Sequence, residues 1–283
     1  MTLRKLPEIK AFDRHEGIES MPSPDVLSKW DLGIRAAEGS SDNSISIYDV
    51  IGADPWTGNG MTAKRVSGAL RAIGNKDVVV NINSPGGDLF EGIAIYNVLR
   101  AHEAKVTVRV MALAASAASV IAMAGDEVQI ARTGFFMVHN AWVMAMGNRH
   151  DLKEVADWLE PFDQAMADLY AARTGMSVKE AAKLMDKETW IGGAEAVDLG
   201  FADNFVPADQ VSEDAAARAA SKDMLAVRRV DALLARQGVS RSERRSLIAS
   251  LKIGTHDAAG HATQDAGDLT AADFQRLIAT LSS

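Results

Sequence analysis

The sequence predicts an α/β fold with one main core, and two observations carry this prediction. Between Ser44 and Phe205, short β-rich runs alternate with helical patterns, as in βαβ units with right-handed crossovers. The chain of 283 residues is 47% hydrophobic, which is enough apolar material for a sizeable core or a core with an appendage. We therefore expect a leader at residues 1–43, a core domain at residues 44–205 and a helical extension at residues 206–283.

The predicted elements of the core follow one another as strand and helix. Apolar runs predict strands, and apolar residues three or four positions apart predict helices. Strands are expected at residues 44–52, 77–83, 105–111, 127–131 and 135–140. Helices are expected at residues 61–74, 88–102, 115–125, 150–173 and 193–200, with a further short helix after a capping box of Ser177 and Glu180. Pro161 should kink or divide the longest helix.

The two flanking segments differ from the core in composition. The leader is polar, and its residues 20–25 and 36–44 are typical of loops or flexible chain. The extension holds ten Lys and Arg against ten Asp and Glu, so the net charge of −8 belongs to the rest of the chain. Its predicted features are a capping box at residues 240–243, an apolar helical face after Thr270, and a flexible linker near residues 253–268.

Composition excludes several classes of protein. A net charge of −8 lacks the broad basic field that nonspecific binding to nucleic acid requires. The chain has no cysteine, which excludes disulfide scaffolds, thiolate metal sites and cysteine nucleophiles. Neither an apolar signal region nor a run of about 18 apolar residues is present. We expect a cytoplasmic protein that binds neither nucleic acid nor membrane.

Two serines in the small-residue run at residues 114–119 are candidates for a nucleophile. Hydrolysis by a serine needs its hydroxyl, an imidazole, a carboxylate and N–H groups for the oxyanion. Ser116 is favoured because it would lie where a helix begins, and unpaired N–H groups there favour negative charge. Ser119 lies almost one turn deeper. Close helix packing explains both serines as well.

His139 is the favoured imidazole among six histidines. It ends the apolar run at residues 135–140, and strand ends in α/β sheets border ligand crevices. The loop at residues 84–87, Ser-Pro-Gly-Gly, could turn backbone N–H groups toward a bound carbonyl. A hydrogen-bonded structural histidine and a simple tight turn are the alternatives, so these residues carry weight only together.

Four blocks in this order resemble the proteolytic subunit of the Clp protease family, and more closely its phage head-maturation relatives. They are INSPGGDLFEGIAIYNVL, AASAASVIAMAG, FFMVHN and ETWIGGAEAVDLGFAD. The resemblance covers about residues 44–205, and VRRVDALLARQGVSRSERRSLI resembles the C-terminal extension of the phage relatives. It implies a ClpP/crotonase-like spiral of ββα units that assembles into homo-oligomeric rings, with active sites facing an enclosed chamber.

The resemblance also assigns roles to residues. It implies Ser116 as the nucleophile, His139 as the general base, and the backbone N–H groups of Gly87 and Ala117 as the oxyanion hole. The family has an Asp where this chain has Glu188, so Glu188 is the favoured acid. The longer side chain changes the reach, and Asp186 is the alternative acid. Ala117 and Ala118 replace a larger residue and a glycine of the bacterial subunit.

The leading hypothesis is a serine endopeptidase, and specifically a prohead maturation protease that cleaves scaffold or capsid precursors, in the host cytoplasm if phage-encoded. One alternative is a crotonase-like acyl-CoA enzyme, for which the sequence offers no basic pocket for the CoA phosphates. Another is a non-catalytic ring-forming assembly protein that uses its helical tail for targeting. Self-cleavage of the leader is a further hypothesis. No cofactor or metal is expected, and a partner unfoldase stays open.

Overall fold

The computed structural model describes residues 6–7, 9, 21–37, 43–54, 60–143 and 145–258, and only the backbone of residues 251–258. The chain divides into two compact units, Met1–Val239 and Ser240–Ser283. The sequence places the start of the helical extension at Val206, whereas the structure counts residues 206–239 in the same unit as the core.

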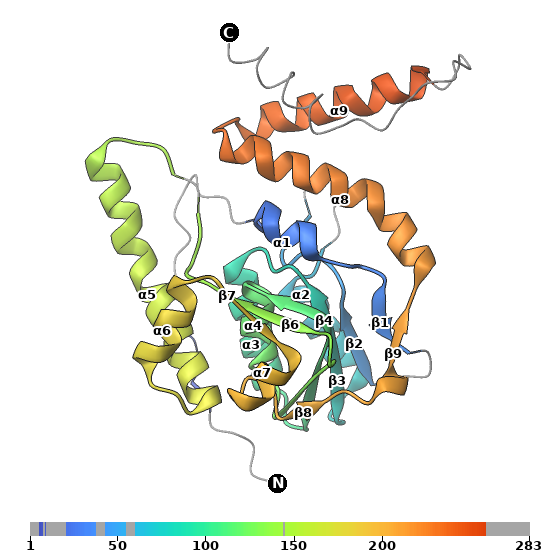
Figure 1. Ribbon diagram of the computed structural model, residues 1–283, viewed down its shortest axis with the longest axis vertical. Helices are drawn as coiled ribbons and strands as arrows, with labels where there is room; N and C mark the ends of the chain where they lie inside the picture. The colour runs from blue at the N-terminus through green and yellow to red at the C-terminus, as the bar shows by residue number, and fades with distance from the viewer. Residues whose placement is uncertain are drawn as a thin grey trace. The chain divides into compact units, whose positions relative to one another are not determined.

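The first unit is built on a mostly parallel sheet (Figure 1). In the described part of the chain its seven strands are β2 (Ser44–Ile47), β3 (Val78–Ser84), β4 (Val106–Ala115), β5 (Glu127–Ile130), β6 (Phe135–Val138), β7 (Thr189–Gly192) and β8 (Asn204–Phe205). The order β2-β3-β4-β5-β8 is parallel throughout. The predicted α/β class is confirmed.

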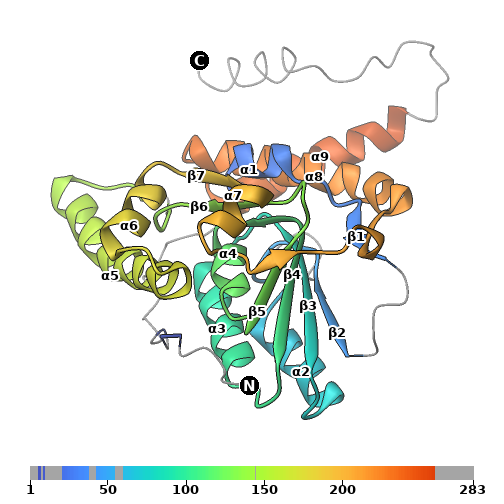
Figure 2. The same ribbon diagram turned by 60° about the horizontal axis from the view of Figure 1, so that its bottom comes forward.

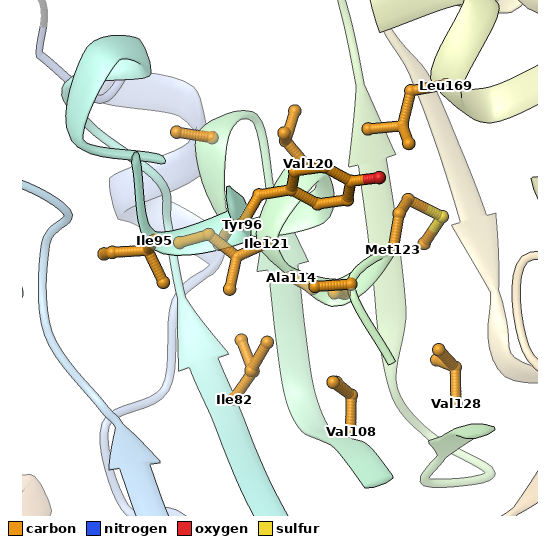
Figure 3. Packing of buried hydrophobic residues seen from close by; sticks show 14 of the residues in the cluster. Ile82, Ile95, Tyr96, Val108, Ala114, Val120, Ile121, Met123, Val128 and Leu169 are labelled. Atoms are coloured by element: carbon orange, nitrogen blue, oxygen red, sulfur yellow. The ribbon is translucent and has the colours of Figure 1, made fainter. Parts of the chain in front are cut away.

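Helices connect successive parallel strands and cover the sheet (Figure 2). They are α2 (Ala63–Ile73), α3 (Leu89–Arg100) and α4 (Ala117–Ala122). Side chains such as Ile95 and Tyr96 of α3 and Val120 of α4 pack on Ile82 and Val108 of the sheet, and all five are fully buried (Figure 3). This continuous apolar core holds α4 against the strands that flank it.

The strand β4 has two successive partners. It pairs with β5 over residues 107–110 and with β6 over residues 113–115. The sequence predicts a helix from Ala115 to Gly125, but the residues up to Ala115 stay extended because β6 supplies backbone hydrogen-bond partners there. Helix α4 is correspondingly shorter than predicted and ends at Ala122.

A long helix, α5 (Arg149–Thr174), reaches away from the sheet in Figure 1. Pro161 lies inside it and does not divide it. A capping box at Asn148 and Asp151 begins it, and Gly175, in the left-handed conformation, ends it. The predicted capping box of Ser177 and Glu180 is confirmed at the start of α6 (Val178–Asp186), and α7 (Gly193–Asp198) follows β7.

The described part of the leader contains regular secondary structure. It contains α1 (Pro24–Lys29) and β1 (Ile34–Ala36), and β1 pairs with β9 (Val211–Glu213), which follows η1 (Ala208–Gln210). The prediction of a loop at residues 20–25 is wrong for its last two residues. Ser23 caps a helix there, and proline suits the first helical position because its missing N–H needs no partner.

Helix α8 (Ala215–Arg236) lies beside α1 in both views (Figures 1 and 2). Together they form a second apolar cluster over the ends of β4 and β6. Its buried members are Val26, Leu27, Trp30, Leu113, Ala115, Met137 and Ala232. Leader and extension therefore both pack on the ends of β4 and β6.

The second unit contains α9 (Arg241–Ala258). The Glu243 N–H donates to Ser240 Oγ at 3.4 Å, which is one half of the predicted capping box. Helix α9 continues into the segment predicted as a linker, and the helix predicted after Thr270 lies outside the described residues. No helix in the described ranges has the length and hydropathy needed to cross a membrane.

A buried arginine ties α5 to the sheet. The Arg173 guanidinium is fully buried and donates to the Gly125 carbonyl at 3.1 Å and to the Asp203 carboxylate. Asp203 also accepts from the Val128 N–H of β5 at 2.8 Å.

Replacing Asp203 by Asn should lower the free energy of unfolding by about 3 kcal/mol, because the buried guanidinium loses its counter-charge. Urea unfolding measures the loss. Asp209→Asn, at an exposed position in η1, is the matched control. Equal stability of the two variants would contradict this role of the ion pair.

Candidate active site

Ser116 occupies the turn between β4 and α4. Its φ of 53° and ψ of −125° lie in a region that residues other than glycine rarely adopt. The turn is held by the Ser116 N–H, which donates to the Met137 carbonyl of β6 at 2.8 Å, and by the Ser119 N–H, which donates to the Ser116 carbonyl at 2.9 Å. The strained backbone thus displays the hydroxyl at the first turn of α4.

The pairing of β4 with β6 brings His139 to Ser116. Ala115 lies opposite Met137 in this pairing, and His139 follows the end of β6. His139 Nε2 lies 2.7 Å from Ser116 Oγ, which is hydrogen-bonding distance. Burial lowers the pKa of His139 from 6.5 to about 4, so its imidazole is neutral at pH 7 and can accept a proton.

The alternative serine has a structural environment instead. Ser119 is fully buried, and its hydroxyl donates to the Ser116 carbonyl at 2.6 Å. It also lies 2.8 Å from the hydroxyl of the buried Tyr170. Of the two candidate serines, the structure therefore brings Ser116 to the imidazole and uses Ser119 to support the turn.

The glycine loop lies beside Ser116. The Ile51 N–H donates to the Gly86 carbonyl at 2.8 Å, and the Asp88 N–H donates to the Ile51 carbonyl at 2.9 Å. In such a bridge the N–H of the intervening Gly87 points away from Ile51. Gly87 has a φ of +144°, and a Cβ there would lie 2.2 Å from the Ile51 carbonyl oxygen, so the position requires glycine.

Ala117 directly follows Ser116 in the chain. It is the first residue of α4, and the N–H groups of a helix's first turn have no acceptor within the helix. The two positions that the sequence predicts as oxyanion donors therefore both border Ser116.

The two predicted acids are placed less directly. Asp186 is exposed, and its Oδ1 accepts from Asn140 Nδ2 at 3.0 Å. Glu188 is exposed and has a φ of 49°. Among the residues that the structure describes, no carboxylate is hydrogen-bonded to the second ring nitrogen of His139.

Glu188 and His139 each adjoin the last pair of the β6–β7 ladder. Strands β6 and β7 are antiparallel, with Val138 opposite Thr189. This is the last pair of the ladder. His139 follows Val138 and Glu188 precedes Thr189 in the chain, and the φ of 49° takes Glu188 out of the extended conformation of β7. Asp186 lies two residues before Glu188 in the chain.

Asp163 of α5 is a residue near the site that the sequence analysis missed. Its Oδ1 accepts from the Ala141 N–H at 2.6 Å, which anchors the segment just after His139. Burial, and then the charge of Asp186, raise the pKa of Asp163 above its ordinary value. The sequence does hold a signal for it. Asp163 follows Leu159 by four residues, which puts an acid on the predicted apolar face of the helix.

An apolar pocket adjoins the Ser116 hydroxyl. Gly87, Ser116 and His139 border it, and its wall is mainly aromatic and aliphatic. The apolar lining comprises Met21, Leu89, Phe90, Ala141, Trp142, Val143, Trp158, Leu159, Phe162 and Met166. The rings of Trp158 and Phe162 pack with centroids 4.9 Å apart. In the described chain, no group of three or more His, Asp or Glu residues could hold a metal ion.

The lowered pKa of His139 can be measured directly. As long as no carboxylate bonds its second ring nitrogen, we expect the imidazole to gain a proton only near pH 4, because burial disfavours the charged form. Hydrogen–deuterium exchange at the histidine Cε1 position, followed by mass spectrometry, gives a midpoint for each histidine. The His139→Gln variant assigns the signal. The midpoint is measured in the Glu188→Gln variant, which has no carboxylate at that position, and a value near the ordinary 6.5 there would contradict the expectation.

Comparison with known proteins identifies the family of this chain. The profile of the Clp protease family matches residues 61–209. The ATP-dependent Clp protease proteolytic subunit 3 of Rhodococcus jostii is 31% identical over 134 residues, which cover 46% of this chain and 66% of that protein. The subunit 3 of Streptomyces avermitilis is 29% identical over 135 residues, covering 47% and 62%. The chain thus spans slightly less than two thirds of these relatives.

Among solved structures, ClpP1 from Listeria monocytogenes is 22% identical, with a TM-score of 0.48, and covers 58% of this chain and 91% of that one. The matched profile spans more than half of the chain, from the start of α2 to η1, and includes Ser116 and His139. The chain belongs to the Clp protease family, with its ClpP-like α/β fold.

Proposed function

We propose that this protein is a serine endopeptidase. The observation that carries the proposal is the 2.7 Å contact between Ser116 Oγ and His139 Nε2 at the first turn of α4. His139 takes the hydroxyl proton as Ser116 Oγ attacks the peptide carbonyl, and then gives it to the leaving amine. Water, deprotonated by the same imidazole, hydrolyses the acyl-enzyme and regenerates Ser116.

The oxyanion of each tetrahedral intermediate is held by two N–H groups. Gly87 and Ala117 supply them, as the family resemblance implies, and both residues border Ser116. The dipole of α4 favours the same negative charge, although this helix is short. Such preorganised donors contribute about 100-fold or more to catalysis each.

Glu188 is proposed as the triad acid, with Asp186 as the alternative. The support for Glu188 is the end of the β6–β7 ladder, where Glu188 and His139 adjoin the last pair, Thr189 and Val138. A carboxylate at the second ring nitrogen would raise the pKa of His139 from its low value and orient the ring. The side chain of Glu188 is exposed, so it can turn toward the ring without breaking a buried contact.

The proposed substrates are proteins. The apolar lining of the pocket beside Ser116 suits an apolar side chain next to the cleaved bond. We further propose that the protein forms a homo-oligomeric ring and matures phage proheads by cleaving capsid or scaffold precursors in the host cytoplasm. The support for this role is the resemblance of the four core blocks and of residues 227–248 to the phage relatives.

The nucleophile is tested by a pair of serine variants. Ser116→Ala should abolish labelling by a fluorophosphonate probe and lower peptide hydrolysis by about 1000-fold or more, because no other hydroxyl of the described residues is hydrogen-bonded to the imidazole. Ser119→Ala is the matched control and should keep the label. A fully active Ser116→Ala protein, or turnover of acyl-CoA esters without peptide hydrolysis, would overturn the assignment.

The acid is tested by isosteric amides. Glu188→Gln should lower kcat by about 100-fold, because the imidazolium loses its counter-charge and its orientation. Asp186→Asn should lower kcat by less than about ten-fold, since an amide oxygen can still accept from Asn140. Steady-state hydrolysis of a fluorogenic peptide measures both. The reverse order would make Asp186 the acid.

A further inference from the structure

We propose that Arg228 of α8 is a positioning residue for the oxyanion-hole loop. The inference rests on the proposed function and adds a role for the helical extension in it. Arg228 and its two acidic partners, Asp49 and Asp54, all lie outside residues 61–209, which the family profile matches.

Arg228 forms a largely buried ion cluster. Its Nη2 lies 2.8 Å from Asp49 Oδ1 and 2.5 Å from Asp54 Oδ2. The side chains of Arg228 and Asp54 are 11% and 2% exposed, and that of Asp49 is 32% exposed. The guanidinium also lies over the buried Trp30 ring, 5.8 Å from its centroid. One cation therefore neutralises two carboxylates of the segment that follows β2.

A chain of hydrogen bonds connects this cluster to the glycine loop. The Asp49 carbonyl accepts from Ser84 Oγ at 2.6 Å, and Ser84 Oγ in turn accepts from the Gly86 N–H at 3.2 Å. Two residues beyond Asp49, Ile51 bonds the Gly86 carbonyl and the Asp88 N–H. The glycine loop is thus hydrogen-bonded to the backbone of the segment that Arg228 anchors.

The close contact between Gly87 and residues 50–51 leaves little room for the two segments to move independently. A Cβ on Gly87 would lie 2.9 Å from Val50 Cγ1 and 2.2 Å from the Ile51 carbonyl oxygen. The direction of the Gly87 N–H therefore depends on where residues 50–51 lie. A displacement of the order of 1 Å at an oxyanion donor is enough to lower catalysis by about 100-fold.

Charge explains why an arginine is needed. Both carboxylates contact the same nitrogen, so without the cation two like charges would face each other in a poorly hydrated place. Their repulsion would drive the segment outward, and residues 50–51 would carry the glycine loop with them. Two donors on one planar group hold such a pair better than an ammonium does.

The test compares Arg228→Met with Arg229→Met in the full-length protein. Arg229 is the next residue on α8 and is exposed, so its variant matches the loss of charge without touching the cluster. The probes are a fluorogenic peptide amide with a leucine before the cleaved bond, the matching peptide boronic acid, and hydrogen–deuterium exchange of residues 84–92. Thermal unfolding of each variant reports folding.

We expect Arg228→Met to lower kcat by about 10- to 100-fold and to weaken boronate binding by a similar factor, with KM changed less than about three-fold. The boronate adduct is tetrahedral and uses the oxyanion hole, whereas the bound substrate depends on it less. Exchange at residues 84–92 should rise in Arg228→Met and not in Arg229→Met.

Two more variants separate positioning from stability. Arg228→Met combined with Asp54→Asn also removes the buried carboxylate charge that faces the guanidinium, and it should regain stability while kcat stays low because Asp49 has still lost Arg228. Arg228→Lys keeps the cation and should retain an intermediate kcat. If neither Arg228→Met nor its combination with Asp54→Asn folds, the same readouts are taken on Arg228→Lys. Wild-type values in Arg228→Lys would then overturn the proposal.

Wild-type kcat and boronate affinity in a folded Arg228→Met protein would also overturn it. Failure of the proposed function gives a different result, in which the wild-type protein itself neither cleaves the peptide nor binds the boronate. The exchange of residues 84–92 then still decides whether Arg228 positions the loop.

Discussion

The pairing of β4 with two successive strands is the constraint on which the rest of this structure depends. Once β5 has ended, the last residues of β4 bond to β6, and the Ser116 N–H completes that ladder on the Met137 carbonyl. The chain must then turn at once into α4, whose small buried residues leave no space for a wider loop. The strained φ of Ser116 is the consequence, and it presents the hydroxyl to His139.

Burial on this edge of the sheet has opposite effects on two kinds of group. It lowers the pKa of His139, which keeps the imidazole neutral and ready to accept a proton. It raises the pKa of Asp163, whose carboxyl group anchors the next segment of chain through the Ala141 N–H. Desolvation thus keeps the imidazole neutral, while the acid expected to orient it and raise its pKa belongs to an exposed turn beside β7.

The leader and the extension both contribute residues to the apolar cluster beside the site. Trp30 of the leader and Ala232 of α8 share an apolar cluster with Ala115 and Met137, each within two residues of Ser116 or His139. Arg236 of α8 also stacks over Trp142 in the wall of the pocket, 5.8 Å from the ring centroid. Segments that resemble appendages in the sequence therefore surround the site and restrict how its strand ends can move.

The sequence by itself determined the α/β class, the capped helix ends, and the places of Ser116 before a helix and His139 after a strand, because periodicity and capping depend on neighbours a few residues away. Only the tertiary structure decided that β6 extends β4, that α1 and Trp30 pack with α8, and that Arg228 meets acids 174 and 179 residues away in the sequence. Strand register and buried ion pairs join residues whose separation leaves no local pattern.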